Sequence, residues 1–296
     1  MPVATGFNAE GNMKVGFIGM GNLGKAMAGR LIEQGFELVV WNRTLGKCEG
    51  LKAEIAESPA AVVSAADVIV LNLFDTAAVL DVLWMENGIL SADIEGKLII
   101  DTTTNHFGDV FQLYDEVESM GGMYLEAPVL GSTVPASKGL LVVLASGSAL
   151  ALEKARPVLD AIGRKTFWLE KEGAASKVKV INNMLLGVFC ASIAEAAALG
   201  EKTGINKAEL LEILAEGAGK SLVMDAKKEK IINSDFSAQF SGACIFKDMG
   251  YLQALAHELQ TPLYTGSLVK ELFGEMFRKG IADEDFSAVY KVFSGE

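Results

Sequence analysis

The chain has 296 residues, of which half are apolar and 22% are charged, and its formal net charge is −12. That length suits two domains, each large enough to bury a hydrophobic core. The negative charge argues against nucleic acid or an anionic membrane as a partner, because both attract basic surfaces.

Cysteine and histidine content excludes further classes of protein. Cys48, Cys190 and Cys244 are far apart, so they form neither a metal-ligand spacing nor a disulfide framework. His106 and His257 are the only histidines, which gives little support to a histidine metal site or a Ser-His-Asp triad. We therefore expect no metal ion, and inert thiols in a reducing compartment.

The first residues, 1–12, are expected to form a short flexible lead. No positively charged residue precedes Lys14, so the sequence predicts no signal peptide. The most apolar stretch, residues 184–199, is interrupted by Glu195 and is expected to be too short to span a bilayer. These patterns favour a cytoplasmic protein.

The first predicted strand runs directly into a G-x-G-x-x-G motif, and a helical pattern follows. In the dinucleotide-binding version of this motif, the first glycine makes a tight turn and the second lets the backbone approach a pyrophosphate. The third glycine lets the helix pack closely on the strand, and the helix N-terminus offers N–H groups to phosphates. The motif is Gly19, Met20, Gly21, Asn22, Leu23 and Gly24. An ordinary glycine-rich turn in another α/β fold is the alternative.

The second predicted strand, residues 36–41, ends in Asn42, Arg43 and Thr44. An NAD site usually has Asp or Glu here to bind the ribose hydroxyls, and no carboxylate is present. The planar, permanently charged side chain of Arg43 suits a phosphate instead, so the pattern predicts NADP. The alternative is a solvated Arg43 with Thr44 as a simple helix cap.

Further apolar runs predict strands at residues 67–73, 97–101, 123–127 and 140–145, separated by helical patterns. This alternation predicts an α/β fold with a doubly wound, mainly parallel sheet over residues 1–172. Ligands of such sheets bind at the carboxyl ends of the strands.

After residue 173 only helical patterns remain, which predicts a second, all-helical domain over residues 173–296. It begins with a long helix over 177–202, followed by helices near 206–217, 221–233, 245–259, 262–279 and 283–293. The long helix is apolar nearly all round, so Met184, Leu185, Phe189 and Ile193 are expected in the core. This helix also suggests self-association, as a homodimer or homotetramer.

Lys179 and Asn183 stand four residues apart near the start of the long helix, so they share one face. A lysine and an amide on an otherwise apolar helix suit carbonyl chemistry, because the ammonium can hand a proton to an oxygen. A solvated helix end is the alternative interpretation.

Four blocks in the expected order make the chain resemble the β-hydroxyacid dehydrogenase family, and the resemblance extends over residues 13–293. They are the glycine motif, residues 126–132 (EAPVLGS), residues 173–183 (GAASKVKVINN) and residues 246–249 (FKDM). The resemblance implies an N-terminal Rossmann domain, a long interdomain helix and a helical C-terminal domain. It also implies an NADPH-dependent oxidoreductase that reduces small aldehyde or keto acids.

The resemblance implies roles for individual residues. Lys179 would be the general acid/base, with Asn183 helping to hold the substrate, and Lys247 would reach the nicotinamide end of the cofactor beside Asp248. The dinucleotide site would be lined by Leu73, Phe74 and Thr104, and the substrate segment is Leu130, Gly131 and Ser132.

Leu130 departs from the family, which usually has serine at this position, so one hydroxyl expected at the substrate carboxylate is missing. The backbone N–H groups of Gly131 and Ser132 would then bind the carboxylate, and a longer or more apolar substrate is expected. Alternatively, Leu130 turns into the core. An imine reductase, which commonly lacks the catalytic lysine, and a non-catalytic NADP-binding scaffold are the alternative functions.

Overall fold

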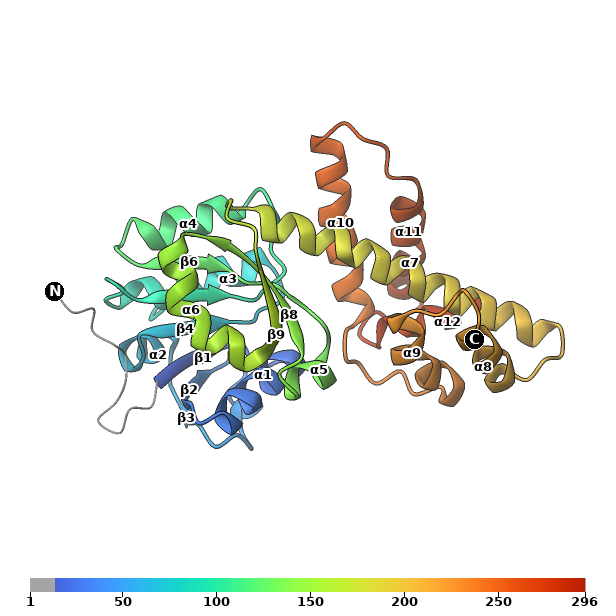
Figure 1. Cartoon of the computed structure of the whole chain (residues 1–296), viewed down its shortest axis with the longest axis horizontal. Coiled ribbons are helices and arrows are strands. Elements are labelled where there is room, and N and C mark those ends of the chain that lie inside the picture. Colours follow the sequence, from blue (N-terminus) through green and yellow to red (C-terminus); the bar gives the residue numbers. More distant parts are fainter. Residues whose placement is uncertain (1–13, 296) are drawn as a thin grey trace. The chain divides into compact units, whose positions relative to one another are not determined.

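The computed structural model describes residues 14–295, so the lead expected at residues 1–12 lies outside the described residues. The chain forms two compact units that divide between Lys179 and Val180. Figure 1 shows the strands in the first unit and only helices in the second. The domain boundary drawn from the sequence after residue 172 stays a prediction.

The first unit is built on a nine-stranded sheet in the order β3-β2-β1-β4-β5-β6-β8-β7, with β9 also paired to β8. The strands from β3 to β6 are parallel, whereas β8 runs antiparallel to β6 and β7. The order around β1 and β4 reverses as in a doubly wound Rossmann fold, which confirms the predicted fold class. The strands are β1 (Lys14–Ile18), β2 (Glu37–Trp41), β3 (Glu54–Ile55), β4 (Val68–Leu71), β5 (Leu98–Asp101), β6 (Met123–Glu126), β7 (Val129–Leu130), β8 (Leu141–Gly147) and β9 (Gly163–Trp168).

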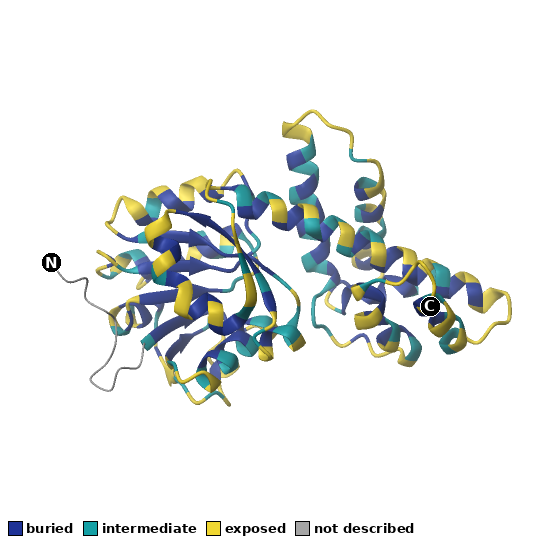
Figure 2. Cartoon of the chain, viewed as in Figure 1, coloured by how far each residue is buried: buried dark blue, intermediate teal, exposed yellow. Residues whose placement is uncertain are grey.

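Helices cover both faces of this sheet, and each face has its own apolar core. One core joins the strands to α1, α5 and α6, and the other joins them to α2, α3 and α4. Figure 2 shows the central strands of the sheet buried and the outer faces of the helices exposed. The helices are α1 (Asn22–Glu33), α2 (Pro59–Ala65), α3 (Thr76–Trp84), α4 (Val110–Glu118), α5 (Thr133–Ser137) and α6 (Ala149–Ile162), with the 3-10 helices η1 (Leu45–Cys48) and η2 (Ile89–Ser91).

The second unit contains most of the long helix α7 (Ala174–Lys202) and the helices that pack around it. The helices α8, α9 and α10 start where the sequence supplies caps: for example, the side chain of Ser221 accepts a hydrogen bond from Met224 N at 3.1 Å. They are α8 (Lys207–Glu216), α9 (Leu222–Asn233), α10 (Gly242–Glu258), α11 (Tyr264–Arg278), η3 (Phe286–Val289) and α12 (Tyr290–Ser294). The helical patterns after residue 173 are therefore confirmed.

The surface of α7 differs from the expectation that this helix is buried all round. Ile193 is buried, but Leu185 is 47% exposed and Phe189 is 41% exposed, so the prediction of core positions is wrong for these two. With 29 residues, α7 is also longer than the apolar stretch at residues 184–199. Among the described residues it is the one helix long and apolar enough to cross a membrane, a test that core helices also pass.

Candidate active site

The glycine motif forms the turn between β1 and α1. Gly19 has φ +106°, and a Cβ atom there would lie 2.1 Å from the carbonyl oxygen of Asn72. A Cβ atom on Gly24 would lie 2.0 Å from the carbonyl oxygen of Gly19. Glycine is therefore required at both positions by the close approach of neighbouring backbone. Gly21 differs, because a Cβ atom there would meet nothing within 4 Å.

The loop around Gly21 suits the pyrophosphate of a dinucleotide. Gly21 precedes the first turn of α1 and offers no side chain, so open space lies over the helix N-terminus. Asn42 stabilises the loop, since its Oδ1 accepts from Met20 N at 3.0 Å and its Nδ2 donates to Thr44 O at 3.0 Å. The side chain of Met20 is buried in the core, and that of Leu23 is half-buried against it.

Arg43 and Thr44 are exposed at the carboxyl end of β2. Thr44 occupies the position before η1, but its side chain makes no capping hydrogen bond, so the simple helix-cap interpretation of this residue is not supported. Arg43 is exposed at the end of β2, and β2 pairs with β1, the strand that leads into the glycine loop.

Polar side chains also follow β4, which pairs with β1, and β5, the next strand along the sheet. The Oγ1 atom of Thr103 accepts from Leu73 N at 3.0 Å, and Asn72 Nδ2 donates to Thr102 Oγ1 at 3.0 Å. Because parallel strands end at one edge, these bonds place Leu73 and Thr104 at the same edge as the glycine loop. Phe74 is half exposed there.

A buried carboxylate, Asp101, stabilises the loop that carries Thr104. It accepts hydrogen bonds from Thr103 N at 2.8 Å, Asn105 Nδ2 at 2.7 Å and Tyr124 Oη at 2.6 Å. Burial raises the pKa of Asp101, although these donors act to lower it. No motif in the sequence indicates this role of Asp101.

The segment predicted to bind the substrate, Leu130 to Ser132, begins at the last residue of β7 and leads into the short helix α5. Gly131 has φ +129°, and a Cβ atom there would lie 2.7 Å from Leu141 Cδ2, so glycine is required. Leu130 is half-buried and pairs with Val142 of β8. The hydroxyl of Ser132 is buried and has no hydrogen-bond partner among the described residues. A buried hydroxyl of this kind is suited to a bound ligand or a water molecule.

Lys179 is 9% exposed on α7, and its Nζ donates to the carbonyl oxygen of Val129 at 2.9 Å. The ammonium group therefore lies beside the start of the predicted substrate segment, within the first unit. This position contradicts the alternative of a solvated helix end. Asn183 lies one turn further along the same helix.

In the second unit, Asp248 joins two of the predicted site residues. Its Oδ2 accepts from Asn183 Nδ2 at 2.6 Å, and its Oδ1 accepts from Lys247 Nζ at 2.7 Å. Burial acts to lower the pKa of Lys247, but the Asp248 carboxylate outweighs burial and the pKa is raised. Lys247 therefore remains a cation, and it also lies 4.7 Å from the centre of the Tyr251 ring.

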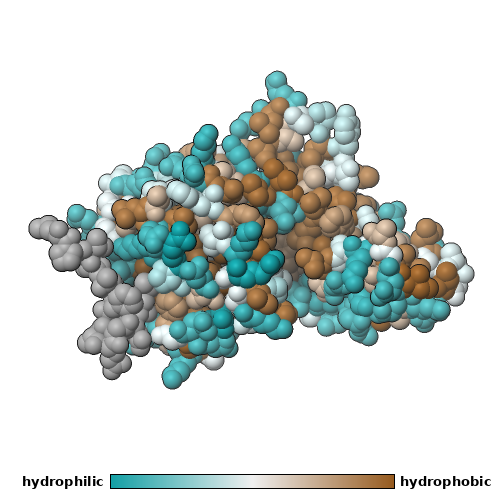
Figure 3. Space-filling model, in the orientation of Figure 1, coloured by the Kyte–Doolittle hydropathy of each residue, from teal (hydrophilic) through white to brown (hydrophobic). Residues whose placement is uncertain are grey.

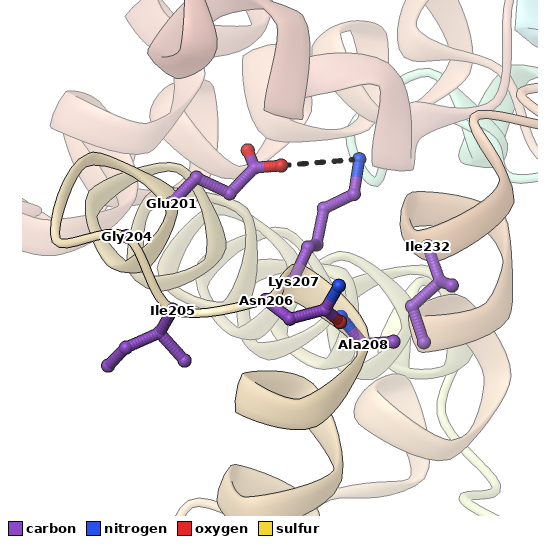
Figure 4. Close-up of a pocket in the computed structure, with 7 residues that line it drawn as sticks. All are labelled: Glu201, Gly204, Ile205, Asn206, Lys207, Ala208 and Ile232. Carbon is purple, nitrogen blue, oxygen red and sulfur yellow. Dashed lines mark hydrogen bonds and ion pairs between the residues drawn. The ribbon is translucent and has the colours of Figure 1, made fainter.

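Other parts of the described chain offer little comparable chemistry. Residues 14–295 contain no cluster of three His, Cys, Asp or Glu side chains that could hold a metal ion. A surface pocket of about 420 Å³ lies at the start of α8, beside the ion pair between Glu201 and Lys207 at 3.7 Å (Figure 4). None of the residues predicted for the site lines it.

Comparisons with known proteins agree with this arrangement. Residues 14–170 match the model for the NAD binding domain of 6-phosphogluconate dehydrogenase. Residues 173–293 match the model for the NAD-binding domain of NADP-dependent 3-hydroxyisobutyrate dehydrogenase. The two matches together cover both units.

Three relatives are similar over nearly the whole of this chain. Glyoxylate/succinic semialdehyde reductase 1 of Arabidopsis thaliana is 34% identical over 94% of this chain and 97% of its own length. 2-(Hydroxymethyl)glutarate dehydrogenase of Eubacterium barkeri is 34% identical over 96% of each chain. The human cytokine-like nuclear factor N-PAC is 33% identical over 95% of this chain, which spans 51% of that longer protein.

Solved structures show the same fold. 3-Hydroxyisobutyrate dehydrogenase from Salmonella typhimurium aligns with a TM-score of 0.88 at 27% identity, over 95% of this chain and all of that one. Psf3, solved in complex with NADP⁺, aligns with a TM-score of 0.87 at 23% identity, over 95% and 100% of the two chains. The chain thus belongs to the 3-hydroxyisobutyrate dehydrogenase-like family of NAD(P)-binding oxidoreductases.

Proposed function

We propose that this protein is an NADPH-dependent reductase of small aldehyde or keto acids, with Lys179 as the general acid. The observation that carries the proposal is the hydrogen bond from Lys179 Nζ to Val129 O at 2.9 Å. It holds a buried ammonium group next to the segment that would bind the substrate carboxylate.

NADPH would be held by the loop of Gly19, Gly21 and Gly24, with Arg43 on the 2′-phosphate. When bound, the nicotinamide supplies the hydride for the carbonyl carbon. The semialdehyde and hydroxyacid names of the two 34% identical relatives support this class of substrate.

The chain's own residues bind the substrate and move the proton. Backbone N–H groups of Gly131 and Ser132 hold the carboxylate, and the buried hydroxyl of Ser132 is suited to add a hydrogen bond. Lys179 then gives a proton to the carbonyl oxygen as that oxygen gains negative charge, and takes one from the alcohol in the reverse reaction. Asn183 would hold the substrate with its amide oriented by Asp248.

A second candidate is a non-catalytic NADP-binding scaffold, favoured by the similarity to a protein named as a nuclear factor. Retention of Lys179 in a buried position argues for catalysis. An imine reductase is a third candidate, and it too is disfavoured by Lys179, which such enzymes commonly lack. We further propose a cytoplasmic protein that acts on a small molecule, binds neither nucleic acid nor membrane, and forms a homodimer or homotetramer.

The test is NADPH oxidation with glyoxylate, the semialdehydes of succinate, methylmalonate and tartronate, and a cyclic imine. We expect turnover of at least one aldehyde acid. Lys179→Ala should lower kcat by about 10²–10⁴, the usual contribution of a general acid. NADPH affinity should hardly change.

Lys177→Ala is the matched control, since Lys177 is on the same helix but lies 5.7 Å from the centre of the Phe107 ring. It should keep near-normal turnover. Turnover of the imine alone would support the third candidate, and cofactor binding without any turnover would support the scaffold. Near-normal kcat in Lys179→Ala would show that another group, with Lys247 the next candidate, is the acid.

A further inference from the structure

Glu126, at the end of β6, is a carboxylate that is almost fully buried against the first turn of α7. Its Oε1 accepts from Gly173 N at 2.6 Å, and its Oε2 accepts from Ser176 N at 3.1 Å and from Ser176 Oγ at 2.5 Å. The first N–H groups of a helix have no partner within the helix, and a negative charge near them is favourable. Glu126 therefore anchors the start of α7 to the sheet.

The same stretch of chain contacts α7 a second time, one helical turn later. Three residues beyond Glu126, the carbonyl oxygen of Val129 accepts the hydrogen bond from Lys179. Residues 126–129 thus bind α7 at Ser176 and again at Lys179, all within the first unit. The substrate segment begins at the next residue, Leu130, so the two contacts relate Lys179 directly to that segment.

A single contact could not set this relationship. The bond to Val129 involves a long, flexible lysine side chain, which can follow the carbonyl oxygen if the helix shifts along its axis or rotates. The three hydrogen bonds that Glu126 accepts come from the backbone at the start of α7 and from a short serine side chain, and these fix the register of α7. Catalytic groups must be held within about 0.5 Å of the productive geometry by such supporting bonds.

We propose that Glu126 is a positioning residue of the reaction, which sets the register of α7 so that Lys179 faces the Leu130–Ser132 segment. The proposal rests on the proposed function of Lys179 as the general acid. It goes beyond helix stability, because a cap that only stabilised α7 could be weakened with no effect on the proton-transfer step.

The chain offers a control bound to the same carboxylate. Tyr114 Oη lies 3.3 Å from Glu126 Oε1 and donates to Ser146 O at 2.8 Å. It takes no part in the hydrogen bonds that link Glu126 to Ser176 and Val129 to Lys179. A second support for the helix, the bond from Ala175 N to Ser146 Oγ at 3.0 Å, remains when Glu126 is changed. We therefore expect Glu126 variants to fold.

The experiment compares Glu126→Gln, Ser176→Ala and Tyr114→Phe in the full chain. Steady-state kinetics use the best aldehyde acid, with NADPH affinity from fluorescence titration and Tm from thermal melts. Glu126→Gln puts an NH₂ group against N–H donors, so it should lower kcat by about 10–100-fold, the effect of a displacement of up to about 1 Å. KM and NADPH affinity should change far less. Ser176→Ala should give a smaller loss of kcat in the same direction.

Tyr114→Phe should lower Tm yet keep kcat near the wild-type value, and Glu126→Asp should recover part of the kcat lost in Glu126→Gln. Wild-type kcat in both Glu126→Gln and Ser176→Ala would overturn the proposal. The proposal would also be overturned if Tyr114→Phe lowered kcat together with Tm, because kcat would then follow stability alone. If Glu126→Gln did not fold, Ser176→Ala would decide in the same way. A wild-type protein without reductase activity, or a fully active Lys179→Ala, would instead contradict the proposed function.

Discussion

At the scale of single residues, Arg43 is expected to determine which cofactor is used. Its exposed guanidinium can bind a 2′-phosphate with two parallel hydrogen bonds. Hydrogen bonds to charged groups contribute about 1.5–3 kcal/mol, so kcat/KM should favour NADPH over NADH by about tenfold or more. Arg43→Glu should reverse the preference. Lys47→Glu, at an exposed lysine of η1, is the control. Equal kcat/KM for both cofactors in the wild type would contradict this assignment.

The glycine motif allows folding and cofactor binding to be separated. A Cβ atom has open space at Gly21 but overlaps the backbone at Gly24. Gly21→Ala should therefore keep the wild-type Tm and weaken NADPH binding, by about tenfold if one charged hydrogen bond is lost. Gly24→Ala should lower Tm, because α1 must move away from Gly19. Fluorescence titration and thermal melts measure the two effects. Normal NADPH affinity in Gly21→Ala would mean that the phosphates do not approach this loop.

Leu130 is expected to influence the choice of substrate. It is half-buried, so it is neither a simple core residue nor a donor to a carboxylate. Leu130→Ser should lower KM for glyoxylate by up to about tenfold, since a neutral hydrogen bond contributes about 0.5–1.5 kcal/mol. Leu140→Ser changes an exposed leucine nearby and should leave KM unaltered. If KM for glyoxylate stayed the same in Leu130→Ser, the backbone alone would bind the carboxylate.

At the scale of helices and strands, local patterns predicted the elements that bury an apolar face. The strands β1, β2 and β4 to β6 consist mostly of apolar residues, and the helices α8, α9 and α10 begin at capping side chains. By contrast β9 was missed, because most of its side chains are exposed and its residues, Gly163–Trp168, lack an apolar run. The two-residue strands β3 and β7 are too short to show any periodicity.

Contacts between residues far apart in sequence could not be predicted. The motifs named Lys179, Asn183 and Lys247 as candidate site residues. No motif indicates that Glu126 contacts α7 from 50 residues away, or that Asp248 contacts Asn183 from 65 residues away. A single carboxylate at the end of an apolar strand forms no sequence pattern that indicates which residue it contacts. The exposed positions of Leu185 and Phe189 were missed for a related reason, since an apolar side chain suits a core and an interface equally well.

A buried ion pair joins α9 to the segment before η3. Lys227 Nζ lies 2.9 Å from Asp285 Oδ2, and both side chains are nearly inaccessible. Asp285 also accepts from Gln239 N at 3.1 Å and from Ser287 Oγ at 2.7 Å. Asp285→Asn leaves a buried ammonium unpaired, so the free energy of unfolding should fall by about 3–5 kcal/mol.

The next residue provides the comparison. Lys228 pairs with Glu212 at 2.6 Å on the surface, where the Glu212 side chain is 56% exposed. Exposed ion pairs contribute little because water screens them, so Lys228→Ala should hardly move the unfolding midpoint. Urea unfolding of both variants tests the contrast, and equal midpoints would show that the buried pair stabilises the second unit no more than a surface pair does.

At the scale of the whole molecule, the exposed face of α7 bears on self-association. Ile181, Leu185 and Phe189 recur every four residues, so they share one face, and each is between 41% and 48% exposed. Figure 3 shows apolar surface over the helices of the second unit. Large exposed apolar patches commonly mark contacts with another protein. A second copy of this chain would cover this face, since two identical apolar faces can pack on each other about a twofold axis.

We therefore expect the wild type to sediment as a dimer or tetramer in analytical ultracentrifugation. Burying a Leu or Phe side chain contributes about 1.5–3 kcal/mol, and a twofold interface buries each one twice. Leu185→Glu or Phe189→Glu should weaken association by at least about 100-fold, since each 1.4 kcal/mol is tenfold in Kd. Leu150→Glu, at an exposed leucine of α6 in the first unit, should leave assembly unchanged. A monomeric wild type, or variants that assemble as the wild type does, would show that α7 is not the interface.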